Sequence, residues 1–200
     1  MIKAVLFDLG DTVFIPDWDA IDEAMRSEAG ISIKMGPETK RFYQEKVLVG
    51  TGTMLETMDM LITQADSAIN PVKALSLYKH FYHINSKIDA NMINLISALR
   101  SSVKVYALSN TNQTHKEVNE DRGIFKNFDR VFLSCDMALR KPDPRIYTEI
   151  LKSIRISPES LVFIDDSKEN IETATRLGII CIHYKAYDTL LIDLVRLGLI

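Results

Sequence analysis

Residues 3–14, "KAVLFDLGDTVF", carry an aspartate at the end of an apolar run, and this stretch decides how the fold is interpreted. The residues Ala4–Phe7 are continuously apolar, which is typical of a strand covered on both faces in a parallel sheet. Asp8 follows the run, and Gly10 then interrupts it. Ligands of open α/β sheets bind at the carboxyl ends of strands, so Asp8 is a candidate site residue.

Four further short runs have the same character, and helical segments separate the later ones. Within 143–154 the apolar residues share one helical stripe, and in 167–178 Ser167 can begin a helix that Gly178 ends. Alternating strands and helices predict a doubly wound α/β sheet. The further predicted strands are "VKVYALS" (103–109), "RVFLS" (130–134), "SLVFID" (160–165) and "ICIHY" (180–184).

Residues 15–85 depart from this alternation, because their periodicity is helical throughout and no strand is expected there. The pattern predicts a helical bundle inserted directly after the first strand. Trp18 is expected to pack in the core of that bundle with its stripe partners, and contact with a substrate is the alternative. The predicted breaks between its helices are Gly30–Gly36, Gly50–Gly52 and Asn70–Pro71.

Composition is that of an ordinary globular chain of 200 residues, 46% hydrophobic and 26% charged. The net charge is −3 and no Lys/Arg run exceeds two residues, which argues against a nucleic-acid partner. No apolar stretch reaches the ~20 residues of a membrane span, and the N-terminal run is too short for a secretory signal. Cys135 and Cys181 are expected to be buried free thiols, so we expect a cytoplasmic protein.

Chemically useful side chains follow four of the predicted strands. Together they offer a carboxylate nucleophile, a hydroxyl and an amide for oxygen atoms, an ammonium and metal-binding acids, as phosphoryl transfer through an aspartyl-phosphate requires. Mg²⁺ could be held by Asp8 and one acid of the 165–166 pair, and Lys141 supplies a further positive charge. The four groups are Asp8, Ser109-Asn110-Thr111, Arg140-Lys141-Pro142 and Asp165-Asp166.

These motifs resemble those of the haloacid dehalogenase-like (HAD) hydrolase superfamily, over about residues 1–14 and 100–184. The pattern is most similar to the α-D-glucose-1-phosphate phosphatase-like branch, in which a histidine follows the second motif, as His115 does here. The resemblance implies a Rossmann-like core, residues 1–14 and 86–200, with a helical cap domain, residues 15–85. The four motifs are "FDLGDT", "LSNT", "RKPDPRIY" and "VFIDDSKENIETATRLGI".

The resemblance also implies a role for each site residue. Asp8 would attack phosphorus, Lys141 would offset charge on the phosphorylated aspartate, and Ser109 would hydrogen-bond a phosphoryl oxygen. The groups expected to bind phosphate or substrate are Ser109, Asn110 and His115, although a helix-surface position is the alternative for His115. The groups expected to hold Mg²⁺ are Asp8, the Gly10 carbonyl and Asp166, with Asp165 beside it and Asn170 where relatives carry another acid.

Gly10 stands where phosphatases of this superfamily commonly carry an acid that protonates the leaving group. General acid–base help is worth about 10²–10⁴-fold, but a nucleophile and a metal ion can still act on a good leaving group, so glycine predicts an altered but competent site. Asp11 is expected to accept backbone hydrogen bonds in the turn after the first strand, and a role as the displaced acid is the alternative. His80 and His83 are expected to face solvent, with a metal role as the less favoured alternative.

The sequence thus predicts a Mg²⁺-dependent phosphatase for a small phosphomonoester, such as a sugar phosphate. A phosphoprotein substrate is the alternative within that chemistry. A hydrolytic dehalogenase would gain nothing from Asp165-Asp166, and a non-catalytic binding module has only Gly10 in its favour. The pattern carries no signal for an oligomeric state.

Overall fold

A computed structural model describes residues 1–200 and contains one five-stranded sheet, in the order β5-β4-β1-β6-β7. All neighbouring strands are parallel, and β1 lies at the centre. Each strand falls within one of the five predicted runs, so the predicted doubly wound α/β sheet is confirmed. The strands are β1 (Ala4–Phe7), β4 (Lys104–Ser109), β5 (Arg130–Leu133), β6 (Leu161–Asp165) and β7 (Ile180–His183).

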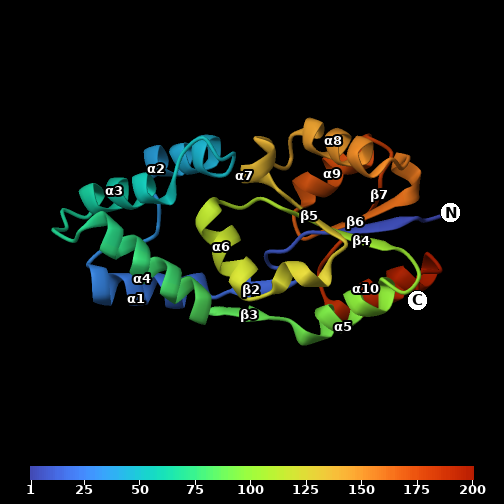
Figure 1. The fold of residues 1–200 in the computed structure, drawn as a ribbon, viewed down its shortest axis with the longest axis horizontal. Coiled ribbons are helices and arrows are strands. Elements are labelled where there is room, and N and C mark those ends of the chain that lie inside the picture. The colour runs from blue at the N-terminus through green and yellow to red at the C-terminus, as the bar shows by residue number, and fades with distance from the viewer.

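Helices cover both faces of the sheet, which explains why the strands are continuously apolar. Ala4 and Leu6 point into a core shared with α8 (Pro144–Ile154) and α9 (Lys168–Arg176). Val5 and Phe7 point into the opposite core, shared with α5 (Ala90–Leu99) and α10 (Tyr187–Arg196). Figure 1 shows α8 and α9 above the strands and α5 and α10 below them.

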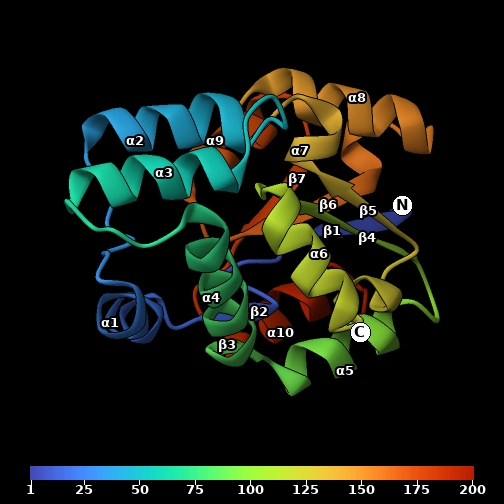
Figure 2. The same ribbon diagram turned by 60° about the vertical axis from the view of Figure 1, so that its left-hand side comes forward.

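The predicted helical bundle lies beside the sheet (Figure 2). Its helices begin at side-chain caps such as Thr53, whose capping box with Glu56 satisfies two free N–H groups at the start of α3. This helical segment, residues 15–85, is inserted after β1 and will be called the cap. Its helices are α1 (Trp18–Ala29), α2 (Pro37–Phe42) with a following π-helical turn (Tyr43–Val47), α3 (Met54–Gln64) and α4 (Pro71–Ile84).

A two-stranded antiparallel ribbon joins the cap to the core, and the expectation of no strand within residues 15–85 is wrong at residues 15 and 16, which belong to this ribbon. In this ribbon β2 (Phe14–Pro16) pairs with β3 (Ser86–Ile88). Each strand has three residues, which is too few to show an alternating pattern in the sequence. The pairing partners are also about 70 residues apart, so only the folded chain reveals them.

The cap also touches the core away from the ribbon. Helix α4 packs on α6 (Gln113–Asp121), where Lys79 Nζ lies 2.6 Å from Glu117 Oε2. Gly50, with φ of 74°, sits so close to α7 (Ser134–Met137) that an added Cβ would lie 2.1 Å from the Cys135 carbonyl oxygen. Two short 3₁₀ turns, Ile124–Asn127 and Pro158–Ser160, complete the core.

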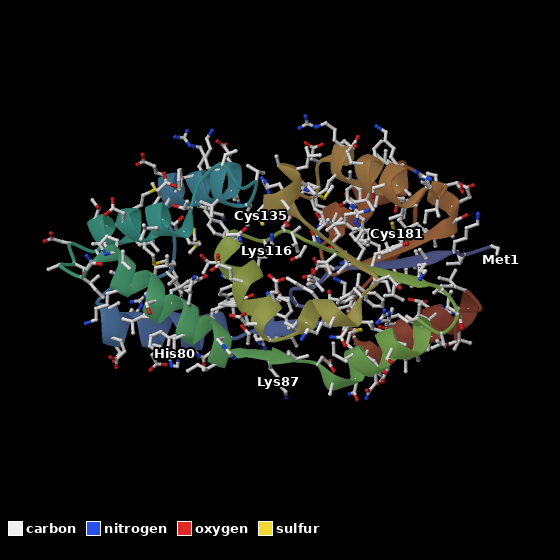
Figure 3. All side chains as sticks on the ribbon, in the orientation of Figure 1. Met1, His80, Lys87, Lys116, Cys135 and Cys181 are labelled. Carbon is white, nitrogen blue, oxygen red and sulfur yellow. The ribbon has the colours of Figure 1, made fainter.

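The two cysteines are free thiols, as predicted, but each is only half-buried. Cys135 lies on α7 and Cys181 on β7, and Figure 3 labels them at separate places in the core. None of the helices combines the length and the apolar character that crossing a bilayer would require.

Candidate active site

A cavity of about 240 Å³ opens at the carboxyl ends of β1, β4 and β6, beneath the cap. It brings together every predicted site residue except Asp165, which lies directly behind it. A larger surface hollow of about 500 Å³, between α2 and α3, contains none of them. The residues that line the smaller cavity are Asp8, Gly10, Asp11, Phe14, Pro16, Trp18, Tyr82, Ser109, Asn110, Thr111, His115, Lys141, Asp166 and Asn170.

Lys141 is buried at the floor of this cavity, and its ammonium is fully hydrogen-bonded. Nζ donates to the Asp8 carboxylate, to Asp165 Oδ2 at 2.7 Å and to the Leu108 carbonyl at 3.1 Å. An ammonium has three N–H donors, so each of them is used. The ion therefore ties the ends of β1, β4 and β6 together and holds positive charge against Asp8.

Burial and charge shift the pKa values of this pair. Burial raises the pKa of Asp8 to about 7, and the Lys141 ammonium opposes that shift. Burial alone would lower the pKa of Lys141, but the Asp8 and Asp165 carboxylates outweigh it and raise the pKa overall. Perturbed titratable groups in a cleft are typical of functional sites. Lys141 thus stays charged and favours the ionised, nucleophilic form of Asp8.

The adjacent acids Asp165 and Asp166 have different surroundings. Both oxygens of buried Asp165 are occupied, because Oδ1 accepts from Ser167 N at 2.8 Å and Asn170 Nδ2 at 2.9 Å while Oδ2 accepts from Lys141. Asp166 is exposed to the cavity, and its carboxylate has no hydrogen-bond partner in the protein. Burial and then the nearby Asp165 raise the pKa of Asp166. Of the two acids, only Asp166 presents free oxygens to the cavity.

Asn110 is the predicted phosphate-binding residue whose side chain is already engaged. Its amide exchanges two hydrogen bonds with the backbone of Lys141, each 2.8 Å long. The side-chain amide of Asn110 therefore fixes the loop that carries Lys141. The backbone N–H of Asn110 has no hydrogen-bond partner in the protein and could bind a phosphoryl oxygen. Ser109, 7% exposed, ends β4 on the cavity wall.

Gly10 and Asp11 form the turn that follows β1. The Asp11 N–H donates to the Phe14 carbonyl at 2.9 Å, whereas the Gly10 carbonyl accepts no hydrogen bond. The expectation that the Asp11 side chain accepts backbone hydrogen bonds is wrong, because main-chain groups close the turn. With φ of 56°, Asp11 directs its carboxylate to the cavity wall, where burial and the charge of Asp166 raise its pKa.

His115 is buried on α6, so the helix-surface alternative is wrong. Its Nε2 lies 2.7 Å from the Tyr78 hydroxyl, and its ring stacks on Tyr82 at a centroid distance of 3.9 Å. Burial lowers the pKa of His115 to about 3, so the imidazole is neutral. Both tyrosines lie in the segment of helical periodicity, but no spacing in the sequence brings them to His115, which is up to 37 residues away.

Trp18 also departs from its prediction. It is 43% exposed at the mouth of the cavity instead of packing in the core of the cap. Its indole lies 5.9 Å from the Tyr82 ring and 6.0 Å from the His115 ring, between centroids.

The histidines of the cap take no part in this site. His80 and His83 are both exposed on α4, as predicted, and His80 is labelled on the cap in Figure 3. No group of three or more His, Cys, Asp or Glu side chains has an arrangement that would hold a metal ion.

Comparison with known proteins places this geometry in context. The family model described as haloacid dehalogenase-like hydrolase matches residues 2–178. A sesquiterpene phosphatase of Aspergillus oryzae is 25% identical over 193 residues, which cover 90% of this chain and 89% of that protein. A drimenol cyclase of Aspergillus calidoustus is 27% identical over 180 residues, 89% of this chain, and the match spans only 33% of that longer protein.

Among solved structures, a HAD-family enzyme of Bacteroides thetaiotaomicron in complex with magnesium superposes with a TM-score of 0.75. The alignment is 26% identical and covers 95% of this chain and 98% of that one.

Proposed function

The chain belongs to the haloacid dehalogenase-like hydrolase family, and from this membership we propose that it is a Mg²⁺-dependent phosphatase that hydrolyses a small phosphomonoester through a phosphorylated Asp8. The observation that carries the proposal is the Asp8 carboxylate at the cavity floor, which is bound to buried Lys141 and lines the same cavity as the free oxygens of Asp166. The similarity to a sesquiterpene phosphatase supports phosphate ester chemistry.

The donor set at the floor fits Mg²⁺. Asp8 and Asp166 supply carboxylates and Gly10 supplies a carbonyl, all hard oxygen ligands. The Gly10 carbonyl and the Asp166 carboxylate have no partner in the protein, which suits groups that bind an ion. Mg²⁺ usually takes one or two protein carboxylates and completes its shell with water and substrate phosphate, so a cluster of three acids is not needed. When bound, the ion would neutralise phosphate charge, and the similar magnesium-bound enzyme supports this assignment.

The chain's own residues account for the two covalent steps. An Asp8 oxygen forms a bond to phosphorus while the ester P–O bond breaks, and the departing alkoxide takes a proton from solvent water. A second water then attacks the phosphorus of phosphorylated Asp8 and loses a proton to solvent. The bond between that phosphorus and the Asp8 oxygen breaks, which releases inorganic phosphate and restores the Asp8 carboxylate. Lys141 offsets the negative charge throughout, and the Ser109 hydroxyl and the Asn110 backbone N–H hydrogen-bond the phosphoryl oxygens.

The cap supplies the rest of the binding site. Its residues, 15–85, contribute the mouth of the cavity through Trp18 and Tyr82, and the leaving group would lie beneath them. His115 supports that mouth from the core side. A sugar phosphate is one small phosphomonoester compatible with this arrangement.

Release of phosphate from p-nitrophenyl phosphate, with Mg²⁺ and then with excess EDTA, tests the proposal. We expect turnover that EDTA abolishes and that excess Mg²⁺ restores. Chloride release from 2-chloropropionate without metal would indicate a dehalogenase instead. No reaction with either compound or with a panel of sugar phosphates and phosphopeptides would favour a non-catalytic binding module.

A further inference from the structure

The cavity has two parts of different chemistry. Its floor is polar and carries Asp8, Lys141 and Asp166, whereas its mouth carries the exposed indole of Trp18. In the β2 strand, Phe14 and Pro16 are buried and face the cavity, while Ile15 is 52% exposed on the other side. Four apolar or aromatic residues line the cavity, and of these only Trp18 is exposed: Phe14, Pro16, Trp18 and Tyr82.

The aromatic part of this mouth is fixed in place before any ligand arrives. Tyr82 stacks on His115 with only 9° between the ring planes, and its hydroxyl lies 3.3 Å from Asn119 Nδ2. His115 is in turn held by the Tyr78 hydroxyl. Trp18 lies against this buried stack and keeps 43% of its surface exposed. Trp18 is therefore an aromatic surface that a ligand can cover without rearrangement of its support.

Charge at the cavity also limits what the mouth can accept. Lys141 is the only cationic side chain among the lining residues, and its three N–H groups are already used. Asp11 keeps negative charge on the wall even when Mg²⁺ neutralises Asp166. A second anionic group on the substrate would meet the Asp11 carboxylate and find no free cationic side chain there. Desolvating an unpaired charge is costly, so such a substrate is disfavoured.

The volume of the cavity also limits the size of the leaving group. About 240 Å³ is below the ~300–1,000 Å³ typical of pockets for drug-sized ligands, and part of it must hold the phosphoryl group. Aromatic side chains bind the flat faces of rings through offset stacking. A small ring would therefore cover more of Trp18 than an open chain of the same size.

We infer that the leaving group is a small uncharged alcohol that places the apolar face of a ring against Trp18, an inference that rests on the proposed phosphatase function. The ring is aromatic, or it is a pyranose with an apolar C–H face. Open-chain polyol phosphates, and esters with a second phosphate or a carboxylate, are poor substrates.

Steady-state kinetics with three esters tests this inference: benzyl phosphate, its 4-carboxy derivative, and glycerol 3-phosphate. The wild type should prefer benzyl phosphate to each of the other two esters by about fivefold to tenfold in kcat/KM, since the aromatic contact that glycerol 3-phosphate lacks and the charge that the 4-carboxy derivative adds are each worth up to about that factor. Trp18→Ala should lower kcat/KM for benzyl phosphate about fivefold to tenfold and leave glycerol 3-phosphate unchanged. Ile15→Ala, which removes an exposed apolar side chain on the opposite side of β2, is the matched control and should change neither value.

Equal kcat/KM for the three esters in the wild type would overturn the inference. So would a Trp18→Ala variant that loses the same factor with benzyl phosphate and with glycerol 3-phosphate.

Binding gives a second measurement that does not depend on turnover. Trp18 is the single tryptophan of the chain, so its fluorescence reports directly on the mouth. With Mg²⁺ present, benzylphosphonate should change the emission saturably, and methylphosphonate, which lacks the ring, should not. An emission change without hydrolysis of any ester would refute the phosphatase proposal and uphold the inference about the mouth. Hydrolysis of the esters with no emission change on adding benzylphosphonate would uphold the phosphatase proposal and refute the inference about the mouth.

Discussion

Lys141 Nζ lies 2.7 Å from Asp165 Oδ2, and the two side chains are only 2% and 0% exposed. The same ammonium binds Asp8, so one buried cation links the candidate nucleophile to the first acid of the 165–166 pair. Asp166, one residue later, points its carboxylate to the cavity without a partner. Two adjacent carboxylates therefore have separate tasks, one in holding the lysine and the other in facing a ligand.

Asp8→Asn should abolish turnover, because the amide is nearly the same shape but is a poor nucleophile and metal ligand. The amide should also leave the thermal unfolding midpoint close to that of the wild type, since Lys141 keeps Asp165 as its partner. Phosphate release and circular dichroism measure the two effects. Activity above a few per cent of the wild type would remove Asp8 from the covalent role.

Asp166→Ala should affect the magnesium requirement, whereas Asp165→Ala should affect the stability of the fold. Without Asp166 the Mg²⁺ concentration for half-maximal activity should rise steeply while stability is retained, because this carboxylate bonds no protein group. Without Asp165 the free energy of unfolding should fall by about 3–5 kcal/mol, because Lys141 loses one of its two carboxylates and the Ser167 N–H and Asn170 Nδ2 both lose their acceptor. Magnesium titrations and urea unfolding distinguish the effects. A larger magnesium requirement in Asp165→Ala than in Asp166→Ala would mean that the ligand is the first acid.

His115→Phe should make the protein less sensitive to acid. The pKa of His115 falls from 6.5 to about 3 in the folded state, so between these values only the unfolded state binds the proton. The contribution of neutral His115 to the free energy of unfolding should therefore be complete above pH 6.5. Below that pH it should fall by about 1.4 kcal/mol per pH unit. Phenylalanine does not titrate, so acidification from pH 7 to pH 4 should lower the unfolding midpoint of the wild type more than that of His115→Phe. A difference that is constant with pH would show that the buried imidazole takes up its proton without unfolding.

Gly50→Ala should disturb the contact between cap and core. The added Cβ would lie 2.1 Å from the Cys135 carbonyl oxygen, which is closer than any real contact. Gly198 has a similar φ of 69° with nothing within 4 Å, so Gly198→Ala is a control that carries the backbone strain alone. Urea unfolding should show a loss in Gly50→Ala that exceeds the control by more than about 1 kcal/mol. Equal losses would mean that the loop moves away from α7 at no cost.

Gly10→Asp should accelerate hydrolysis of esters with poor alkoxide leaving groups more than those with good ones. A Cβ at Gly10 meets nothing within 4 Å, so there is room for the first carbon of the new side chain. An acid at this position could protonate a departing alkoxide, whereas nitrophenolate hardly needs a proton. The slope of log kcat/KM against leaving-group pKa should become shallower. An unchanged slope would indicate that proton donation is already supplied elsewhere in the cavity.

The sequence by itself determined the sheet and the positions of its strand ends. Each apolar run is a local signal, and the parallel arrangement then brings Asp8, Ser109 and Asp166 to one edge. For this reason the predicted site residues, with Asp165 directly behind them, gather at a single cavity. The helices of the cap were predictable for the same reason, since helical periodicity is also local.

The tertiary structure alone decided which partner each of these groups has. Whether Asp165 or Asp166 faces the cavity depends on Lys141, 24 residues earlier, and the burial of His115 depends on a tyrosine 37 residues away. The exposure of Trp18 and the pairing of β2 with β3 likewise depend on how the cap returns to the core. Contacts between distant residues leave no periodic signal in the sequence, because hydrogen bonds and ring stacking form only where the folded chain brings those groups together.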